Sequence, residues 1–296
     1  MHLNWQRARR PIGILVLALT SIVCLWGCQK ADVRYSATLD RAALMHLPFP
    51  SWQTADQGKV QQLDLSAAAP AKDKNKAATA PTLTEVTPIY VVRLDDTHAA
   101  MLTLALPVDD SNQPMNCHAC PGTIGAYFFE HTDAGWRLTD RQDAVAQSGV
   151  EGNIGKTSVV KLAEGHYALS AEWGSCWQGY CGSWLVVVGL VPGKATLLSP
   201  GIALSAQNDG AYGACSALDG AQDASQQPGE LHECFDVSGT WQYQGSRLLV
   251  SFDGRLSELD ASGKLLPTKK IAQQAVYAIA PGRMTLQEGT NPVPHF

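Results

Sequence analysis

From Val86 onward, short apolar runs alternate with turn residues, and this pattern constrains the fold most strongly. The runs are rich in β-branched and aromatic residues, which suit strands, and no apolar pattern of helical period accompanies them. Gly, Pro, Asp and Asn separate the runs. Strands at such spacing predict an all-β fold, an antiparallel meander forming a sandwich or a propeller-like domain. The expected strands lie at residues 89–92, 101–106, 126–131, 136–138, 158–162, 166–173, 183–191, 195–198, 234–243, 248–252 and 275–280.

The chain before Val86 has a different composition. Residues 29–66 show no long periodic run, and Pro48 and Pro50 exclude a helix interior around them. Residues 66–81 are mainly Ala, Pro and Lys and contain no bulky apolar side chain, so the sequence predicts a flexible linker there. We therefore expect a flexible N-terminal tether at 28–85 and a disulfide-pinned β domain at 86–296.

The first residues have the pattern of an export signal. Arg7, Arg9 and Arg10 precede an almost wholly apolar run at residues 12–25. A basic stretch followed by an apolar run of this length is typical of a secretory signal peptide, and it is short for a membrane span, which needs about 20 residues. We expect residues 1–27 to be a signal peptide.

The apolar run ends in Leu25-Trp26-Gly27-Cys28. This tetrapeptide resembles the lipobox of bacterial lipoproteins, in which the signal peptide is cleaved before the Cys. Trp26 departs from the family pattern, which favours a small or aliphatic residue there. The resemblance implies that Cys28 carries acyl chains such as palmitate and anchors the protein to a membrane. No Asp follows Cys28, which in that family favours the outer membrane, facing the periplasm or the surface.

The charge of the chain argues against nucleic acid as a partner. Lys and Arg number 22 against 27 Asp and Glu, a net charge of −5. Without the three arginines of the leader the balance is 19 against 27, or −8. Since the mature chain is acidic and has no cluster of basic residues, it lacks the electrostatic footprint of a nucleic-acid-binding protein.

Six cysteines remain after Cys24 in the leader and Cys28 are set aside. An even number in an exported chain indicates a disulfide framework, and six cysteines allow 15 connectivities. Their spacing favours three local pairs, and bonds that close short loops pin those loops rather than hold a whole domain together. The expected pairs are Cys117–Cys120, Cys176–Cys181 and Cys215–Cys234.

The segment Cys117-His118-Ala119-Cys120 allows several interpretations. Pro121 follows it where haem attachment needs His, so a c-type haem site is excluded. A structural disulfide loop, a redox-active dithiol and a soft-metal site at Cys117, His118 and Cys120 stay open. A turn and a strand follow the pair where a redox dithiol would have a helix. The segment also resembles a stretch in exported bacterial proteins of unknown function, which implies no activity.

Other motifs that would carry chemistry are missing from the sequence. There is no nucleophile elbow, P-loop, zinc-protease motif or Rossmann glycine pattern. A catalytic triad assembled only in space stays open. Asn208-Asp209-Gly210 has too few oxygen ligands for a calcium loop and is predicted to be a turn. We expect no cofactor, and the sequence favours a non-catalytic protein.

Aromatic residues surround the expected Cys176–Cys181 loop. Trp173, Trp177, Tyr180 and Trp184 all lie within twelve residues. Exposed aromatic side chains on a rigid loop are good binding anchors, while aromatics packed over the disulfide are the structural alternative. Gly and Gln beside Trp177 and Tyr180 favour a turn, and we select these two residues as candidate binding residues.

Together these features predict a membrane-anchored lipoprotein of the cell envelope with a binding or structural β domain. Its partner would be an envelope protein, a glycan, or a toxin or lysozyme. The alternative is an envelope thiol-redox or soft-metal-handling protein that acts through Cys117, His118 and Cys120.

Overall fold

The computed structural model describes residues 33–68, 81–212, 215, 232–262 and 266–296. Arg34–Phe296 forms one compact unit. The leader, Cys28 and residues 69–80 of the expected linker lie outside the described residues. None of the helices in the described part of the chain is long and apolar enough to cross a membrane.

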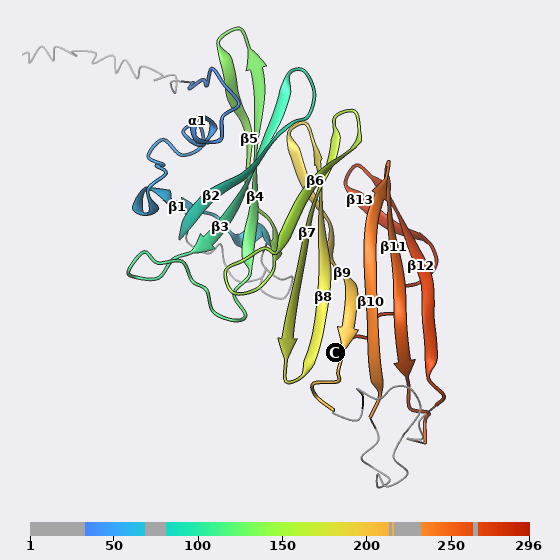
Figure 1. Ribbon diagram of the computed structural model, residues 1–296. Coiled ribbons are helices and arrows are strands. Elements are labelled where there is room, and N and C mark those ends of the chain that lie inside the picture. Colours follow the sequence, from blue (N-terminus) through green and yellow to red (C-terminus); the bar gives the residue numbers. More distant parts are fainter. Residues whose placement is uncertain (1–32, 69–80, 213–214, 216–231, 263–265) are drawn as a thin grey trace, which may run out of the picture. The chain divides into compact units, whose positions relative to one another are not determined.

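The unit Arg34–Phe296 is an antiparallel β meander of two sheets, which confirms the expected all-β class. Each strand pairs with its neighbour in sequence within its sheet, so the colours of Figure 1 run in order across each sheet. One of the sheets is curled as a half-barrel. The first sheet contains β1 (Val60–Leu63), β2 (Thr82–Arg93), β3 (His98–Pro107), β4 (Gly122–Thr132) and β5 (Gly135–Ser148). The second contains β6 (Lys156–Ala163), β7 (His166–Trp177), β8 (Tyr180–Val191), β9 (Lys194–Gln207), β10 (Cys234–Gln244), β11 (Arg247–Ser257), β12 (Lys269–Ala280) and β13 (Arg283–Glu288).

The two sheets share an apolar core, as the sandwich alternative predicts. Leu102 of β3 and Phe128 of β4 belong to the same buried cluster as Leu169 of β7 and Val188 of β8. The side chain of Gln142 in β5 also bonds to the backbone of Ala195 in β9, as donor at 3.1 Å and as acceptor at 2.7 Å. The sheets are therefore joined by apolar burial and by a polar bridge.

Strand β8 is buried on both faces, which explains its unbroken apolar run at residues 185–190. Val186 and Val188 face the core between the sheets, whereas Leu185 and Val187 face a second core within the second sheet. Such two-sided burial replaces the alternation of apolar and polar residues expected for a half-exposed strand. Val293, beyond the last strand, also belongs to the second core.

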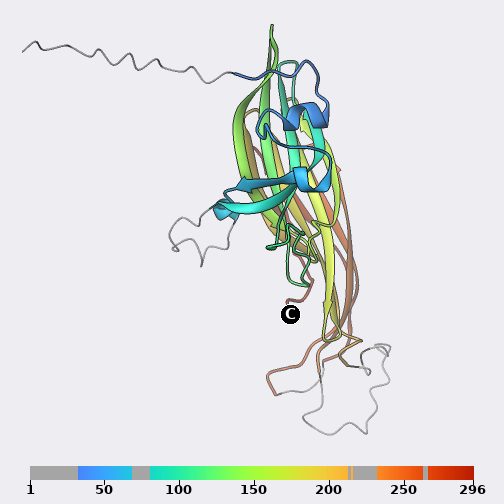
Figure 2. The ribbon, with the colours of Figure 1, turned by 90° about the vertical axis from the view of Figure 1, so that its left-hand side faces the viewer.

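The segment before Val86 is not only a tether, and the expected domain boundary is wrong in this respect. A third core on the first sheet is covered by α1 (Arg41–Met45) and the chain that follows it, where Met45 and Trp52 are buried. The indole Nε1 of Trp52 donates to the carbonyl of Val86 at 2.9 Å. Figure 2 shows this blue segment lying against the first sheet. The short helices η1 (Asp56–Lys59) and η2 (Ser66–Ala68) complete the segment.

The segment before Val86 packs on the first sheet because large apolar residues are scattered through it. Leu44, Phe49 and Leu63 have no helical or strand period, yet all three are buried. The side chain of Asp40 caps α1 by accepting from the backbone N–H groups of Ala42 and Ala43. The compact domain therefore begins well before Val86, at Arg34.

Candidate functional site

A tight hairpin between β7 and β8 presents the two candidate binding residues. Gln178 and Gly179 form its two-residue turn, with φ of 51° and 86°. Positive φ at both central positions is the signature of a type I′ turn, whose twist matches that of the flanking strands. Trp177 and Tyr180 face each other as the last strand pair before the turn. Both side chains are thus placed by regular β geometry.

The Cys176–Cys181 disulfide joins the next pair of the same hairpin. The two cysteines are directly opposite each other, with Cα atoms 4.0 Å apart. The structure also contains the other two expected pairings, Cys117–Cys120 and Cys215–Cys234. Three disulfides in one chain are typical of a protein exported to an oxidising compartment.

The turn is held in place by the loop after β9. A Cβ atom on Gly179 would lie 2.1 Å from the backbone nitrogen of Ala211, so this contact requires glycine. Asn208 is 1% exposed, and its amide donates to the carbonyl of Glu233 at 2.7 Å and accepts from the N–H of Phe235 at 3.0 Å. The turn predicted at Asn208 is present, and the Asn208 side chain stabilises this loop against β10.

These elements form an aromatic groove at the end of the second sheet, with a volume of about 670 Å³. Its sides are the hairpin, the loop after β9, the start of β10 and the last two residues of the chain. We call it the aromatic groove. It is lined by Trp177, Tyr180, Asn208, Tyr212, His232, Glu233, Phe235, Leu259, His295 and Phe296.

The rings of the groove contact one another in a chain. Phe296 stacks on Tyr180 with ring centroids 5.6 Å apart, and Tyr180 meets Tyr212 edge-on at 6.1 Å. Tyr212 stacks on His232 at 3.7 Å. The hydroxyl of Tyr180 donates to that of Tyr212 at 3.1 Å, and this bond raises the pKa of Tyr180. A Cβ atom on Gly182 would lie 2.8 Å from the ring of Phe296, so the missing side chain makes room for that ring.

Trp177 is the exposed end of this arrangement, with 64% of its surface accessible. The imidazole of His118, from the Cys117–Cys120 loop, stacks on its indole with centroids 5.6 Å apart. His118 Nδ1 also lies 3.2 Å from a carboxylate oxygen of Glu151. The two segments that the sequence singled out independently therefore meet at Trp177.

The Cys117–Cys120 loop has the local geometry of a structural turn. The N–H of Cys120 donates to the carbonyl of Cys117 at 2.9 Å, and the N–H of Gly152 donates to the carbonyl of Cys120 at 2.8 Å. Strand β4 begins at Gly122, so the expected turn and strand follow the pair. The described residues contain no group of three His, Cys, Asp or Glu side chains that could hold a metal ion.

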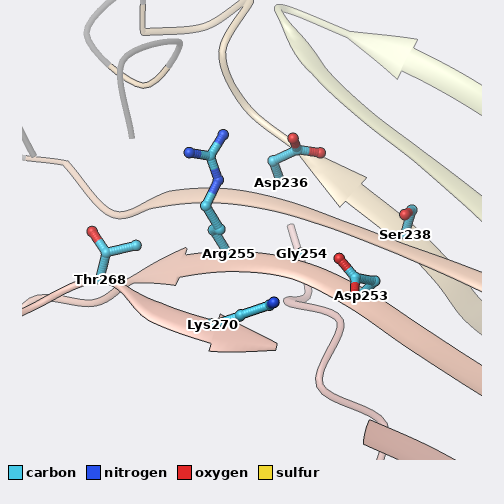
Figure 3. A pocket seen from close by; sticks show the side chains of 7 residues that line it. All are labelled: Asp236, Ser238, Asp253, Gly254, Arg255, Thr268 and Lys270. Atoms are coloured by element: carbon cyan, nitrogen blue, oxygen red, sulfur yellow. The ribbon is translucent and has the colours of Figure 1, made fainter. Parts of the chain in front are cut away.

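A polar hollow of about 490 Å³ lies over β10, β11 and β12 (Figure 3). Asp236, Arg255 and Lys270 are aligned across these three strands by the strand register. Asp253 adds a second carboxylate, so two acidic and two basic side chains line the hollow. Opposite charges on neighbouring strands stabilise a solvated sheet face, and this balanced set favours no ligand charge.

Comparison with known proteins identifies no relative: no protein-family model, no curated protein and no solved structure matches the chain. Sequence reasoning missed most of the groove, including Tyr212, His232, Phe235 and Phe296. One signal was present, because Tyr212, His232 and Phe235 each lie within three residues of Cys215 or Cys234.

Proposed function

We propose that this chain is a lipid-anchored protein of the bacterial cell envelope whose β domain binds a partner through the aromatic groove and catalyses no reaction. The observation that carries the proposal is the 64% exposed Trp177 on a disulfide-closed hairpin that borders an aromatic groove. An envelope protein or a glycan is the class of partner that such a site in the envelope would meet.

Rigidity supports binding by this hairpin. The I′ turn, the disulfide and the packing of Gly179 on the loop after β9 all limit its motion. A preorganised anchor loses little conformational entropy when it binds. Large aromatic side chains contribute much of the binding energy at protein interfaces. We therefore assign the exposed Trp177 a role in recognition and not in the stability of the fold.

The lipid anchor rests on the leader and on Leu25-Trp26-Gly27-Cys28. Each buried CH₂ contributes about 0.8 kcal/mol, so stable anchoring needs two or more acyl chains. The outer membrane is proposed because no Asp follows Cys28. Mass spectrometry of the mature N-terminus tests the anchor: an acylated Cys28 supports it, whereas an unmodified Cys28 or an intact leader overturns it.

Binding by the groove is tested in the cell envelope by site-specific photocross-linking. A photoreactive phenylalanine analogue at position 177, which keeps a large aromatic side chain there, should give a discrete adduct, and the adduct should be lost when Tyr212→Ala is added to remodel the groove. The matched control carries the photoreactive residue at position 35, where Tyr35 is 45% exposed. Equal cross-linking from both positions, or none from position 177, contradicts the proposal.

The second candidate function is thiol-redox or soft-metal handling through Cys117, His118 and Cys120. The observation that favours it is exposure, because Cys117 and His118 both lie on the surface. A thiol count after mild reduction, followed by titration with copper(I), separates the two candidates. Selective reduction of this disulfide or stoichiometric metal binding supports the second candidate, and neither result is expected from the first.

A further inference from the structure

We infer that the aromatic groove takes up the cationic side chains, Arg or Lys, of a basic segment of a partner protein. The inference rests on the proposed function, because it assigns a chemical class to the partner of the same groove. Two independent observations lead to it: the aromatic lining with the exposed Trp177, and the sign of the charge in the lining.

Aromatic rings attract cations because the ring quadrupole places partial negative charge on each face. An ammonium or guanidinium group within about 6 Å of a ring centroid gains from this attraction, most strongly on Trp and Tyr. Trp177, Tyr180 and Tyr212 all line the groove. The His118 ring stacks on Trp177 outside the groove lining, and Trp177 nevertheless keeps most of its surface accessible.

The fixed charge of the groove is negative. Among its described lining residues Glu233 is the only Asp or Glu, and no Lys or Arg lines it. The described chain on either side of these lining residues has the same bias, since residues 195–212, 215 and 232–246 contain no Lys or Arg. Of the described residues in that stretch, Asp209 and Glu233 are acidic and lie in or next to the lining. Glu151 lies beside His118, whose ring stacks on Trp177.

This distribution favours a protein segment over a small organic cation. A volume of about 670 Å³ exceeds what one ammonium headgroup needs. Glu233 in the lining and Glu151 beside His118 would together complement two positive charges on one chain. Electrostatic complementarity of this kind also speeds the encounter of the partners and makes it sensitive to salt.

The inference is tested by calorimetric titration of the full mature protein in detergent with hexaarginine. Hexacitrulline, which keeps the shape of arginine and loses its charge, is the matched neutral peptide. Tetramethylammonium is the small-cation probe. We expect hexaarginine to bind at low salt, hexacitrulline to bind at least about tenfold more weakly, and tetramethylammonium not to compete.

Variants locate the binding. Trp177→Ala and Glu233→Gln should each weaken hexaarginine at least about fivefold. The controls are Tyr35→Ala, an exposed aromatic residue in the N-terminal segment, and Glu164→Gln, an exposed acid at the other end of β7. Both controls should bind as the wild type does.

Four results would overturn the inference. Equal affinity for hexaarginine and hexacitrulline shows that the positive charge of the peptide plays no part in binding. Equal losses of hexaarginine affinity in the groove variants and in Glu164→Gln indicate non-specific electrostatic attraction. Full competition by tetramethylammonium assigns the groove to a small cation instead. If hexaarginine does not bind while position 177 still cross-links in the envelope, the assignment of a cationic partner is wrong. The proposed function then stands.

Discussion

Trp177 and Tyr180 are opposite each other in one hairpin, yet they have different surroundings. Tyr180 is half-buried between Tyr212 and Phe296, whereas Trp177 is mostly exposed and contacts His118 of a distant loop. One residue of the pair thus holds the hairpin to the domain and the other remains available on the surface. This division of roles is what makes the hairpin a candidate recognition element.

The exposure of Trp177 predicts that its side chain contributes little to stability. Trp177→Ala should change the free energy of unfolding by no more than about 0.5 kcal/mol, as exposed substitutions usually do. Trp136→Ala is the matched control, because Trp136 is 4% exposed and should cost about 3–5 kcal/mol. Denaturant melts of both variants check this. A loss of several kcal/mol at Trp177 would show that it seals the core.

The contact between Gly179 and the loop after β9 predicts that Gly179→Ala lowers the free energy of unfolding more than the same substitution at a glycine without such a contact. Gly193→Ala places a side chain at φ 73° with nothing within 4 Å, so only backbone strain of about 1 kcal/mol is expected. Gly179→Ala has similar strain, at φ 86°, and also meets the backbone of Ala211, which adds about 1–3 kcal/mol of overpacking. Chemical denaturation compares the two variants, and equal losses would contradict the packing seen here.

The disulfides should differ in their contribution to stability according to loop length. Closing the separation of 5 residues between Cys176 and Cys181 corresponds to about 2 kcal/mol in the chain-entropy account. The separation of 19 residues between Cys215 and Cys234 corresponds to about 3 kcal/mol. Replacing both Cys215 and Cys234 by Ser should therefore lower the stability measured by thermal unfolding more than replacing both Cys176 and Cys181 does. The opposite order would show that strain or residual structure decides the effect.

His166 predicts a loss of stability in mild acid. The residue is 7% exposed, its Nε2 has no hydrogen-bond partner in the described structure, and burial lowers its pKa. Because the unfolded chain then binds the proton more readily, this contribution is complete above the unfolded pKa of about 6.5 and is lost as the pH falls through the folded pKa.

His166→Phe and His166→Gln, neither of which titrates, test this dependence. Both variants should show a smaller decrease in the free energy of unfolding between pH 8 and pH 5 than the wild type does. The comparison uses the slope of stability with pH, so a general destabilisation by either substitution does not obscure it. Slopes equal to that of the wild type would assign the acid sensitivity to other groups.

The strands that sequence reasoning missed are those with polar faces. The prediction at 136–138 covered only the start of β5, which continues to Ser148 through Thr139, Asp140 and Arg141. Because β5 is an edge strand of the first sheet, its central residues are exposed and carry no apolar signal. Strand β13, one of the two edge strands of the second sheet, has mostly exposed residues and was missed for the same reason.

The sequence by itself determined the features that depend on neighbouring residues. Turn residues between β-forming runs were enough for an antiparallel meander, and short cysteine separations were enough for the three disulfide pairings. Only the tertiary structure decided how Met45 and Trp52 cover the first sheet, how His118 meets Trp177, and how Phe296 reaches the groove. These contacts join residues far apart in the chain, where burial and shape complementarity select the partner and leave no periodic pattern in the sequence.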